Sequence, residues 1–236
     1  MKSKILQRTG TVSSAFVLAL FLACKPANNT TAQQPAPPAA PAAAEAAKPA
    51  AGTVRYDAQP TGSKMIIEGT STIHDWHMDS VVLGGWIECD PKFPDSALTD
   101  PKAAKPNVYV FMPVRSFKSY NKRMDEVMQE HMKEPQFKKI EYRLTELKPK
   151  SAAGATGPLQ FDAIGALTIA GKTNTHTMTV AIAKAEGNKL KITGSTALKM
   201  TAFGVEPPAP SIGLGLIKTG DDIKLTFEWL LQQKAQ

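Results

Sequence analysis

The stretch of the chain that most restricts its fold is residues 161–183. Apolar or small residues occupy the odd positions of its first half and the even positions of its second half. Alternation with a period of two is the pattern of a β-strand with one buried face. Residues 170–174 separate the halves and include Gly171 and Asn174, which favour turns. The stretch therefore predicts a β-hairpin with one apolar face, which further strands must cover.

The same alternation recurs along the rest of the chain. It predicts strands at 53–57, 64–71, 80–89, 107–114, 139–147, 189–198 and 222–231. Apart from 53–57, which could be a short opening strand, these and the two strands of the hairpin make about eight well-patterned strands. No β-helix-β rhythm accompanies them, so we expect an all-β fold with an antiparallel sheet. Eight antiparallel strands can close into a barrel that holds one slender ligand, but the pattern alone does not distinguish a barrel from a sandwich.

One amphipathic helix is expected at residues 122–133, between the strand patterns. Asn121 is a suitable N-cap, and Pro135 ends the pattern. The apolar face of this helix consists of Met124, Val127, Met128 and Met132. Three methionines on one face suit a pliable lid over an apolar cavity. They also suit a helix packed on the end of a barrel, which is the preferred interpretation.

The first 52 residues do not have the composition of a folded domain. Residues 1–23 have a basic start and a short apolar run, which is typical of a signal peptide. The run ends at Cys24 in a sequence that resembles a bacterial lipobox, so we expect Cys24 to be lipidated; ordinary cleavage before an inert Cys24 is the alternative. Residues 24–52 then form a linker rich in alanine and proline, which cannot bury a core. Both interpretations predict an exported protein.

One folded domain is therefore predicted at residues 53–236. The whole chain carries a net charge of +7, and removing Lys2, Lys4 and Arg8 of the signal peptide leaves +4. The remaining basic residues are scattered, so no nucleic-acid-binding surface is expected. Cys89 has no partner if Cys24 is acylated, and its place at a strand end favours a small core residue over a reactive thiol.

The sequence contains none of the familiar catalytic patterns. It has no G-x-S-x-G, Cys-x-x-Cys, G-x-G-x-x-G or HExxH segment, so neither an enzyme nor a bound cofactor is expected. The cluster His74, Asp75, Trp76 and His77 contains candidate metal ligands. A metal site needs further ligands from elsewhere, and His131 and His176 lie on distant elements, so no metal site is predicted.

Large apolar side chains in the strands are the candidate ligand-binding residues. Each of them packs in the core if the interior is filled, and the inward-facing ones line a tunnel if the barrel is open. The residues selected for a tunnel wall are Trp86, Phe111, Tyr142, Phe161, Leu167, Phe227 and Trp229.

Several segments resemble segments of the YceI-like family, and they follow one another along the chain in the family's order. Residues 165–173 are similar to the family's G-x-L-T-h-x-G-x-T segment, where h is apolar. Similar matches, spread over residues 54–231, are 112–117 (MPVRSF), 121–125 (NKRMD), 135–140 (PQFKKI) and 199–207 (KMTAFGVEP). The early segment 68–76 departs from the usual family opening and is similar to a form seen in exported members.

This resemblance implies an eight-stranded antiparallel lipocalin-like barrel with an apolar tunnel. It further implies binding of a polyisoprenoid or quinone-like long-chain lipid in the periplasm, often by a homodimer. With Cys24, it predicts a non-catalytic lipid carrier attached to the membrane through a lipid anchor. The alternatives are a structural or interaction lipoprotein with a filled core and a metal-binding protein that uses His74 and His77.

Overall fold

The computed structural model describes residues 52–104, 106–209 and 217–235. The predicted signal peptide, Cys24 and nearly all of the predicted linker lie outside the described residues. The strands are β1 (Val54–Ala58), β2 (Lys64–Ser71), β3 (Trp76–Ser80), β4 (Gly84–Cys89), β5 (Asn107–Pro113), β6 (Lys139–Pro149), β7 (Leu159–Ile169), β8 (Lys172–Ala185), β9 (Lys189–Lys199) and β10 (Thr219–Gln233). The helices are α1 (Asp95–Thr99) and α2 (Lys122–His131), with short 3₁₀ turns η1 (Val114–Ser116) and η2 (Thr201–Phe203).

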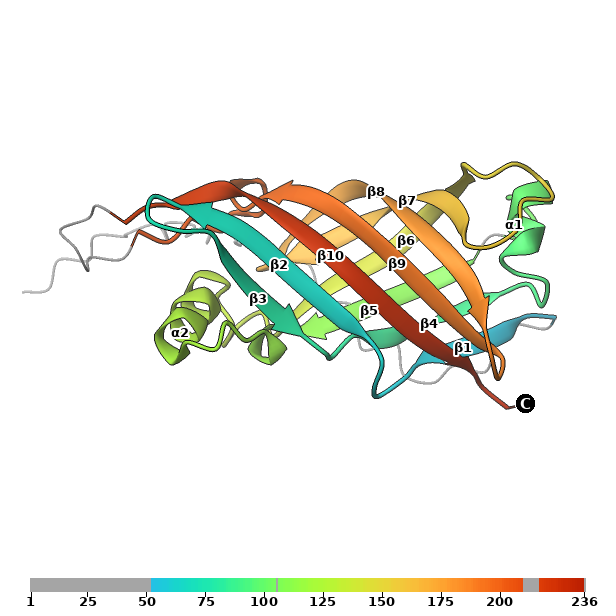
Figure 1. Cartoon of the computed structure of the whole chain (residues 1–236), viewed down its shortest axis with the longest axis horizontal. Coiled ribbons are helices and arrows are strands. Elements are labelled where there is room, and N and C mark those ends of the chain that lie inside the picture. The colour runs from blue at the N-terminus through green and yellow to red at the C-terminus, as the bar shows by residue number, and fades with distance from the viewer. Residues whose placement is uncertain (1–51, 105, 210–216, 236) are drawn as a thin grey trace, which may run out of the picture. The chain divides into compact units, whose positions relative to one another are not determined.

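The strands form one closed antiparallel barrel (Figure 1). The order around it is β1-β4-β5-β6-β7-β8-β9-β10, and β10 pairs with β1 to close the ring. The 15-residue strand β10 pairs with β9 on one edge. On the other edge it pairs first with β2 and then with β1. Strands β1 and β2 lie end to end, and so do their partners β4 and β3. Ten strands therefore fill eight positions, which confirms the predicted eight-stranded antiparallel lipocalin-like barrel.

Alternating side chains explain why these segments close around an apolar interior. On β7, every second residue from Leu159 to Ile169 is buried, including Gly165. The paired strand β8 places Val180 and Ile182 on the same inner face. The other face of both strands is more exposed and carries most of their polar residues, so burial of the apolar side chains fixes the register.

The hairpin between β7 and β8 turns more tightly than predicted. Its turn consists of Ala170 and Gly171, which both have positive φ angles, 48° and 81°. Two central residues with positive φ are typical of a two-residue turn whose twist matches that of the strands. A Cβ atom at Gly171 would lie 2.4 Å from the ring of Phe137, so only glycine fits there. Lys172 already belongs to β8.

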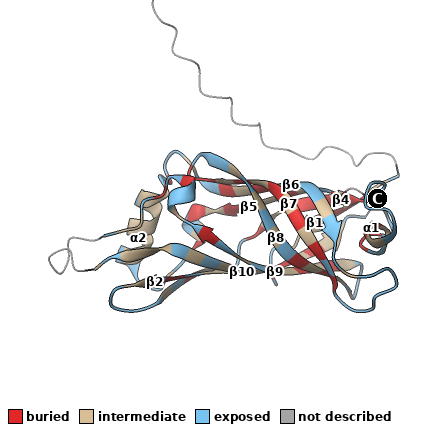
Figure 2. Cartoon of the chain, turned by 90° about the horizontal axis from the view of Figure 1, so that it is seen from above, coloured by how far each residue is buried: buried red, intermediate tan, exposed pale blue. Residues whose placement is uncertain are grey.

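The amphipathic helix α2 lies at one end of the barrel and α1 at the other (Figure 2). The side-chain oxygen of Asn121 accepts hydrogen bonds from the backbone amides of Arg123 (3.0 Å) and Met124 (3.3 Å), which confirms the predicted N-cap. The helix ends at His131, two residues earlier than predicted. Among the described residues, no helix is both long and apolar enough to cross a membrane.

Two elements were missed by the sequence analysis, and one was misplaced. Strand β3 is short and contains His77 and Asp79, which are weak strand formers. Helix α1 has only five residues, too few for a helical period to appear. The predicted strand 80–89 begins only at Gly84, because Val81 and Val82 form an exposed connection despite their apolar side chains.

Phe161 supplies a test of the packed part of the barrel. Its side chain is fully buried, so we expect Phe161→Ala to lower the free energy of unfolding by about 3–5 kcal/mol through lost burial and the resulting cavity. Urea unfolding followed by circular dichroism measures this change. Tyr120→Ala is the control, because Tyr120 is 80% exposed and its removal should have a small effect. Equal effects of the two substitutions would contradict the arrangement.

Candidate functional site

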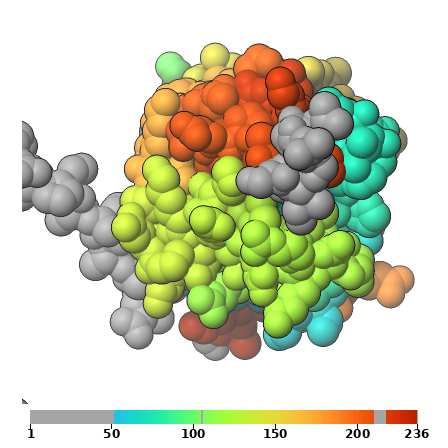
Figure 3. All heavy atoms as spheres, turned by 90° about the vertical axis from the view of Figure 1, so that its left-hand side faces the viewer, coloured from blue at the N-terminus to red at the C-terminus, as the bar shows by residue number. Residues whose placement is uncertain are grey.

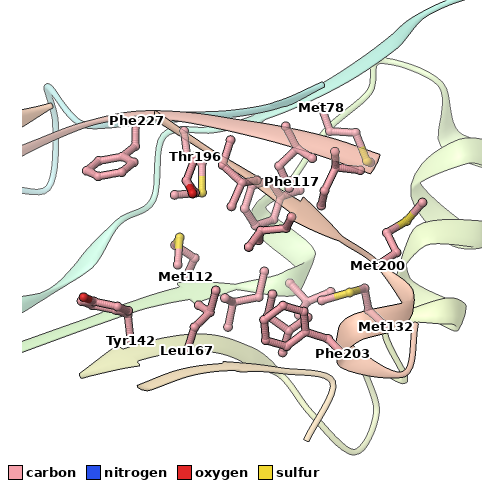
Figure 4. A pocket seen from close by; sticks show the side chains of 18 of the residues that line it. Met78, Met112, Phe117, Met132, Tyr142, Leu167, Thr196, Met200, Phe203 and Phe227 are labelled. Atoms are coloured by element: carbon pink, nitrogen blue, oxygen red, sulfur yellow. The ribbon is translucent and has the colours of Figure 1, made fainter. Parts of the chain in front are cut away.

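The interior of the barrel contains an apolar cavity with a volume of about 440 Å³, which we call the tunnel (Figure 4). Inward-facing strand residues form most of its wall, and α2 with the segment around η2 completes it at one end. Among the described residues, no aspartate or glutamate lines the tunnel, and its lining arginine and lysine are Arg123 and Lys199. Its volume is within the range of sites for small organic ligands. The interior of the barrel is therefore not filled along its whole length.

Methionines supply much of the tunnel wall. All methionines of the chain line it except Met1, which lies outside the described residues. They are Met65, Met78, Met112 and Met178 of the strands, Met124, Met128 and Met132 of α2, and Met200 beside η2. Methionine is unbranched and polarisable, so such a wall adapts to ligands of irregular shape. The sequence analysis used only the helical methionines. Met178 occupies a predicted apolar position of the hairpin, whereas Met78 lies on the missed strand β3 and Met112 on β5, whose inward face the pattern left open.

The tunnel is covered at one end by two segments that lie side by side. Figure 3 shows α2 next to the segment that follows β9. The two are joined by a hydrogen bond between Nδ1 of His131 and the backbone oxygen of Glu206 (2.8 Å). Phe203 of η2 is buried beneath them. The helix thus packs on the end of the barrel, as preferred, and its methionine face is also part of the tunnel wall.

Four of the predicted tunnel residues lie on the tunnel wall: Tyr142, Leu167, Phe227 and Trp229. Two glycines on neighbouring strands make room for the aromatic rings. A Cβ atom at Gly165 would lie 2.5 Å from the Tyr142 ring, and one at Gly194 would lie 2.7 Å from the Phe227 ring. These glycines therefore allow the rings to lie close to the barrel wall, which leaves the central space open.

Trp86 and Phe111 do not line the tunnel, which corrects the prediction for both. On β5 the aliphatic residues face inward and the aromatic residues face outward, a choice that the sequence pattern left open because both faces are apolar. The guanidinium carbon of Arg55 lies 4.7 Å from the centroid of the Trp86 ring. Nζ of Lys139 lies 4.7 Å from that of the Phe111 ring. These cation–π contacts cover the outer aromatic rings.

Phe161 is also absent from the tunnel wall. It faces inward, but the barrel is filled at its level, where Leu190 and Leu231 are likewise fully buried. The tunnel therefore occupies the part of the barrel nearer α2 and ends at a packed core. Alternation predicted which way Phe161 points, but it could not predict where along the barrel the open space ends.

Few polar atoms accompany the apolar wall. The hydroxyl of Tyr142 and Nε1 of Trp229 are buried and have no hydrogen-bond partner among the described residues. Burial raises the pKa of Tyr142, so its hydroxyl stays protonated. Nε2 of His176 lies 2.7 Å from Oγ1 of Thr196, a tunnel residue. Burial lowers the pKa of His176, which favours a neutral ring at pH 7.

The cluster of residues 74–77 does not converge on one point. His74 and Trp76 line the tunnel, whereas His77 is exposed on β3, between inward-facing neighbours. Nδ1 of His74 lies 2.9 Å from the backbone oxygen of Asp75, and Nε1 of Trp76 donates to the backbone oxygen of Thr70 (3.1 Å). Within the described part of the chain, no group of three His, Cys, Asp or Glu residues is placed to hold a metal ion.

Comparison with known proteins decides the family. The YceI-like domain model matches residues 52–230, most of the chain. The chain belongs to the YceI-like family. No curated protein matches the sequence.

Two solved structures share the YceI-like fold of this protein. BcnA of Burkholderia cenocepacia is 19% identical, with a TM-score of 0.55 over 71% of this chain and 95% of that one. A polyisoprenoid-binding domain from Saccharophagus degradans, implicated in plant cell wall breakdown, is 10% identical, with a TM-score of 0.57 over 76% and 98% of the two chains. At these identities the likeness establishes the barrel fold of the YceI-like protein.

Cys89 of this YceI-like protein is expected to be chemically inert. It is a free cysteine, 1% exposed, at the end of β4. Burial, with a smaller contribution from the Asp90 carboxylate, raises the pKa of Cys89 to about 12. The thiol therefore stays protonated at pH 8, and the thiolate is the reactive form.

Alkylation of Cys89 measures this inertness. In a Cys24→Ser chain, which leaves Cys89 as the single cysteine, we expect iodoacetamide to label the native protein at pH 8 far more slowly than the urea-unfolded protein. Mass spectrometry over time follows the reaction. Equal labelling rates in the two states would show that Cys89 is accessible and reactive.

Proposed function

We propose that this YceI-like protein binds and carries a polyisoprenoid or quinone-like long-chain lipid without catalysing a reaction. The observation that supports the proposal most directly is an apolar tunnel that the protein's own side chains leave open. Removing one CH₂ group from water contributes about 0.8 kcal/mol, so a long hydrocarbon chain gains enough from burial to occupy such a space. The adaptable methionine wall suits a chain with many bends.

Two further observations support a binding role. The described tunnel wall has no carboxylate, and its cationic residues are Arg123 and Lys199, so its surface is matched to an uncharged chain. A structural neighbour of the same fold is a polyisoprenoid-binding domain. Membership of the YceI-like family also favours a binding protein over an enzyme.

A substitution that fills the tunnel tests the proposal. Ala163 lies on the tunnel wall, so we expect Ala163→Phe to remove most of the lipid that copurifies with the protein, at a stability cost of about 1–3 kcal/mol. Organic extraction followed by lipid mass spectrometry measures the amount bound per barrel.

Ala166→Phe is the matched control, because Ala166 is on the same strand and is absent from the tunnel wall. It should keep its lipid. A wild-type protein that is well folded, contains no lipid and ignores added isoprenoid quinone would contradict the carrier function. In that case an interaction protein becomes the better explanation.

The sequence supports a place for this carrier in the cell. Residues 1–23 have the composition of a signal peptide, and Cys24 follows a sequence that resembles a lipobox. We therefore propose that an acylated Cys24 holds the protein at the periplasmic membrane surface. A single linker-borne anchor leaves the barrel free to pair with a second copy, as the family resemblance implies for a homodimer.

Fractionation of cells tests the anchor. We expect the wild-type protein in the membrane fraction and the Cys24→Ser variant in the soluble periplasmic fraction, because the variant has no site for the acyl chains. Intact mass measures the lipid modification in the same samples, and light scattering of the detergent-free variant measures its oligomeric state. Equal distribution of both proteins would remove the lipid anchor from the proposal.

A further inference from the structure

The segment that covers the α2 end of the tunnel exposes mainly positive charge. This α2 cover, residues 115–138, runs from η1 through α2 and lies across the face of the molecule seen in Figure 3. It contains six lysines and arginines against four carboxylates, and all six basic side chains are exposed. They are Arg115, Lys118, Lys122, Arg123, Lys133 and Lys138.

Two of the four carboxylates are turned inwards. The side chain of Glu134 is 5% exposed and forms an ion pair with Arg115 (2.8 Å). The side chain of Asp125 is 13% exposed, and it accepts hydrogen bonds from the backbone amide (2.8 Å) and the hydroxyl (2.7 Å) of Ser119. Six exposed cations of the cover therefore outnumber two exposed carboxylates, those of Glu126 and Glu130.

Large apolar side chains are exposed beside this basic surface. In the described part of the chain they are Ile73 (61%), Val81 (61%), Val82 (44%) and Tyr120 (80%). Ile73 precedes the short strand β3, and Val81 and Val82 follow it. The backbone of Asp79 in β3 pairs with that of Lys118, two residues before Tyr120. All four exposed side chains thus belong to β3's flanks or to the part of the α2 cover that pairs with β3.

Tyr120 is an unusual residue for its position. Its φ angle is 63°, in a region that bulky residues rarely adopt. Interaction with the Asp79 carboxylate raises the pKa of Tyr120, so the phenol stays uncharged at pH 7. Tyrosine is enriched where a membrane meets water, because its ring is apolar and its tip is polar. An exposed tyrosine among cations is typical of a membrane-contact site.

The two kinds of side chain together match a lipid surface. Cations attract anionic head groups, while aliphatic and aromatic side chains enter the boundary between head groups and acyl chains. The same cover contributes Met124, Met128 and Met132 to the tunnel wall. An acidic protein would also attract the cations, but it would not explain why they surround the end of an apolar tunnel.

We propose that the α2 cover and the flanks of β3 dock the barrel onto an anionic lipid bilayer. Ile73, Val81 and Tyr120 enter the head-group region, and Lys118 and Lys122 bind lipid phosphates. The folded domain makes this contact itself, so the proposal goes beyond the carrier function and beyond an anchor on the linker. Docking brings the methionine-lined end of the tunnel next to the bilayer.

Vesicle binding by the full-length Cys24→Ser chain tests the docking, because this chain has no acylation site. We expect it to bind vesicles of phosphatidylglycerol and phosphatidylcholine, and to bind more weakly to phosphatidylcholine alone or at high salt. A lysine near an anionic surface changes the affinity about fivefold. Lys118→Glu combined with Lys122→Glu should therefore weaken binding at least about 20-fold. Co-sedimentation measures the affinity, and circular dichroism checks that the variant is folded.

Lys92→Glu combined with Lys102→Glu is the matched control. Both lysines are exposed and flank α1, at the opposite end of the barrel from α2 (Figure 2), and the net charge changes by the same amount. This variant should bind the mixed vesicles as its parent does. Equal losses in the two double variants would reduce the effect to net charge and overturn the docking surface. A parent chain that ignores the vesicles would overturn it in favour of an acidic protein partner.

A fluorescent label shows which surface meets the bilayer. In the Cys24→Ser chain, where Cys89 is buried, an environment-sensitive dye is attached through Tyr120→Cys or through Glu186→Cys. Glu186 is exposed in the connection between β8 and β9, and β8 begins at the α2 end, where Gly171 meets Phe137. The emission at Tyr120→Cys should shift to shorter wavelength on addition of vesicles, and that at Glu186→Cys should not.

Equal or reversed responses of the two labels would overturn the docking surface. A signal peptide that is still attached is common to all the chains compared, so differences between them report the folded domain. None of these measurements depends on lipid inside the tunnel. Loss of vesicle binding leaves the carrier function in place, and a tunnel without copurifying lipid leaves the docking surface in place.

Discussion

The closure of the sheet through β10 is the constraint on which the rest of the structure depends. This strand pairs with β9 along one edge and with β2 and then β1 along the other. Closure satisfies the backbone groups within the ring, so no strand edge has to be covered from inside. Whether the interior is filled or open therefore depends on the side chains alone. Side chains fill the interior near Phe161 and Leu231 and leave it open nearer α2.

The unfilled part of the barrel is a costly arrangement unless something occupies it. Close packing is the normal state of a protein interior, and a void forfeits dispersion contacts along its whole lining. Methionine lowers this cost because its flexible side chain follows the shape of whatever occupies the space. Gly165 and Gly194 keep the space open, because they allow the neighbouring aromatic rings to lie close to the barrel wall. Both features are consistent with a binding tunnel.

Alternation in the sequence predicted most of the strands and the inward direction of Tyr142, Leu167, Phe227 and Trp229. It failed on β5, where Phe111 faces outward, because two apolar faces give no information on which one is buried. It also failed on β3, whose polar residues resemble a loop. Alternation also could not predict how far the tunnel extends. The open space ends where side chains from several strands meet at one level of the barrel.

The distribution of polarity along the tunnel separates two kinds of lipid. The cationic side chains of the tunnel wall, Arg123 and Lys199, lie at the end covered by α2 and are exposed, so water can hydrate a charged head group there. Both are already paired, with Glu126 and Asp222, which weakens their attraction for a phosphate. Farther inside, the described tunnel wall has no lysine, arginine or carboxylate. The described wall is therefore better matched to an uncharged hydrocarbon chain than to a phosphate group.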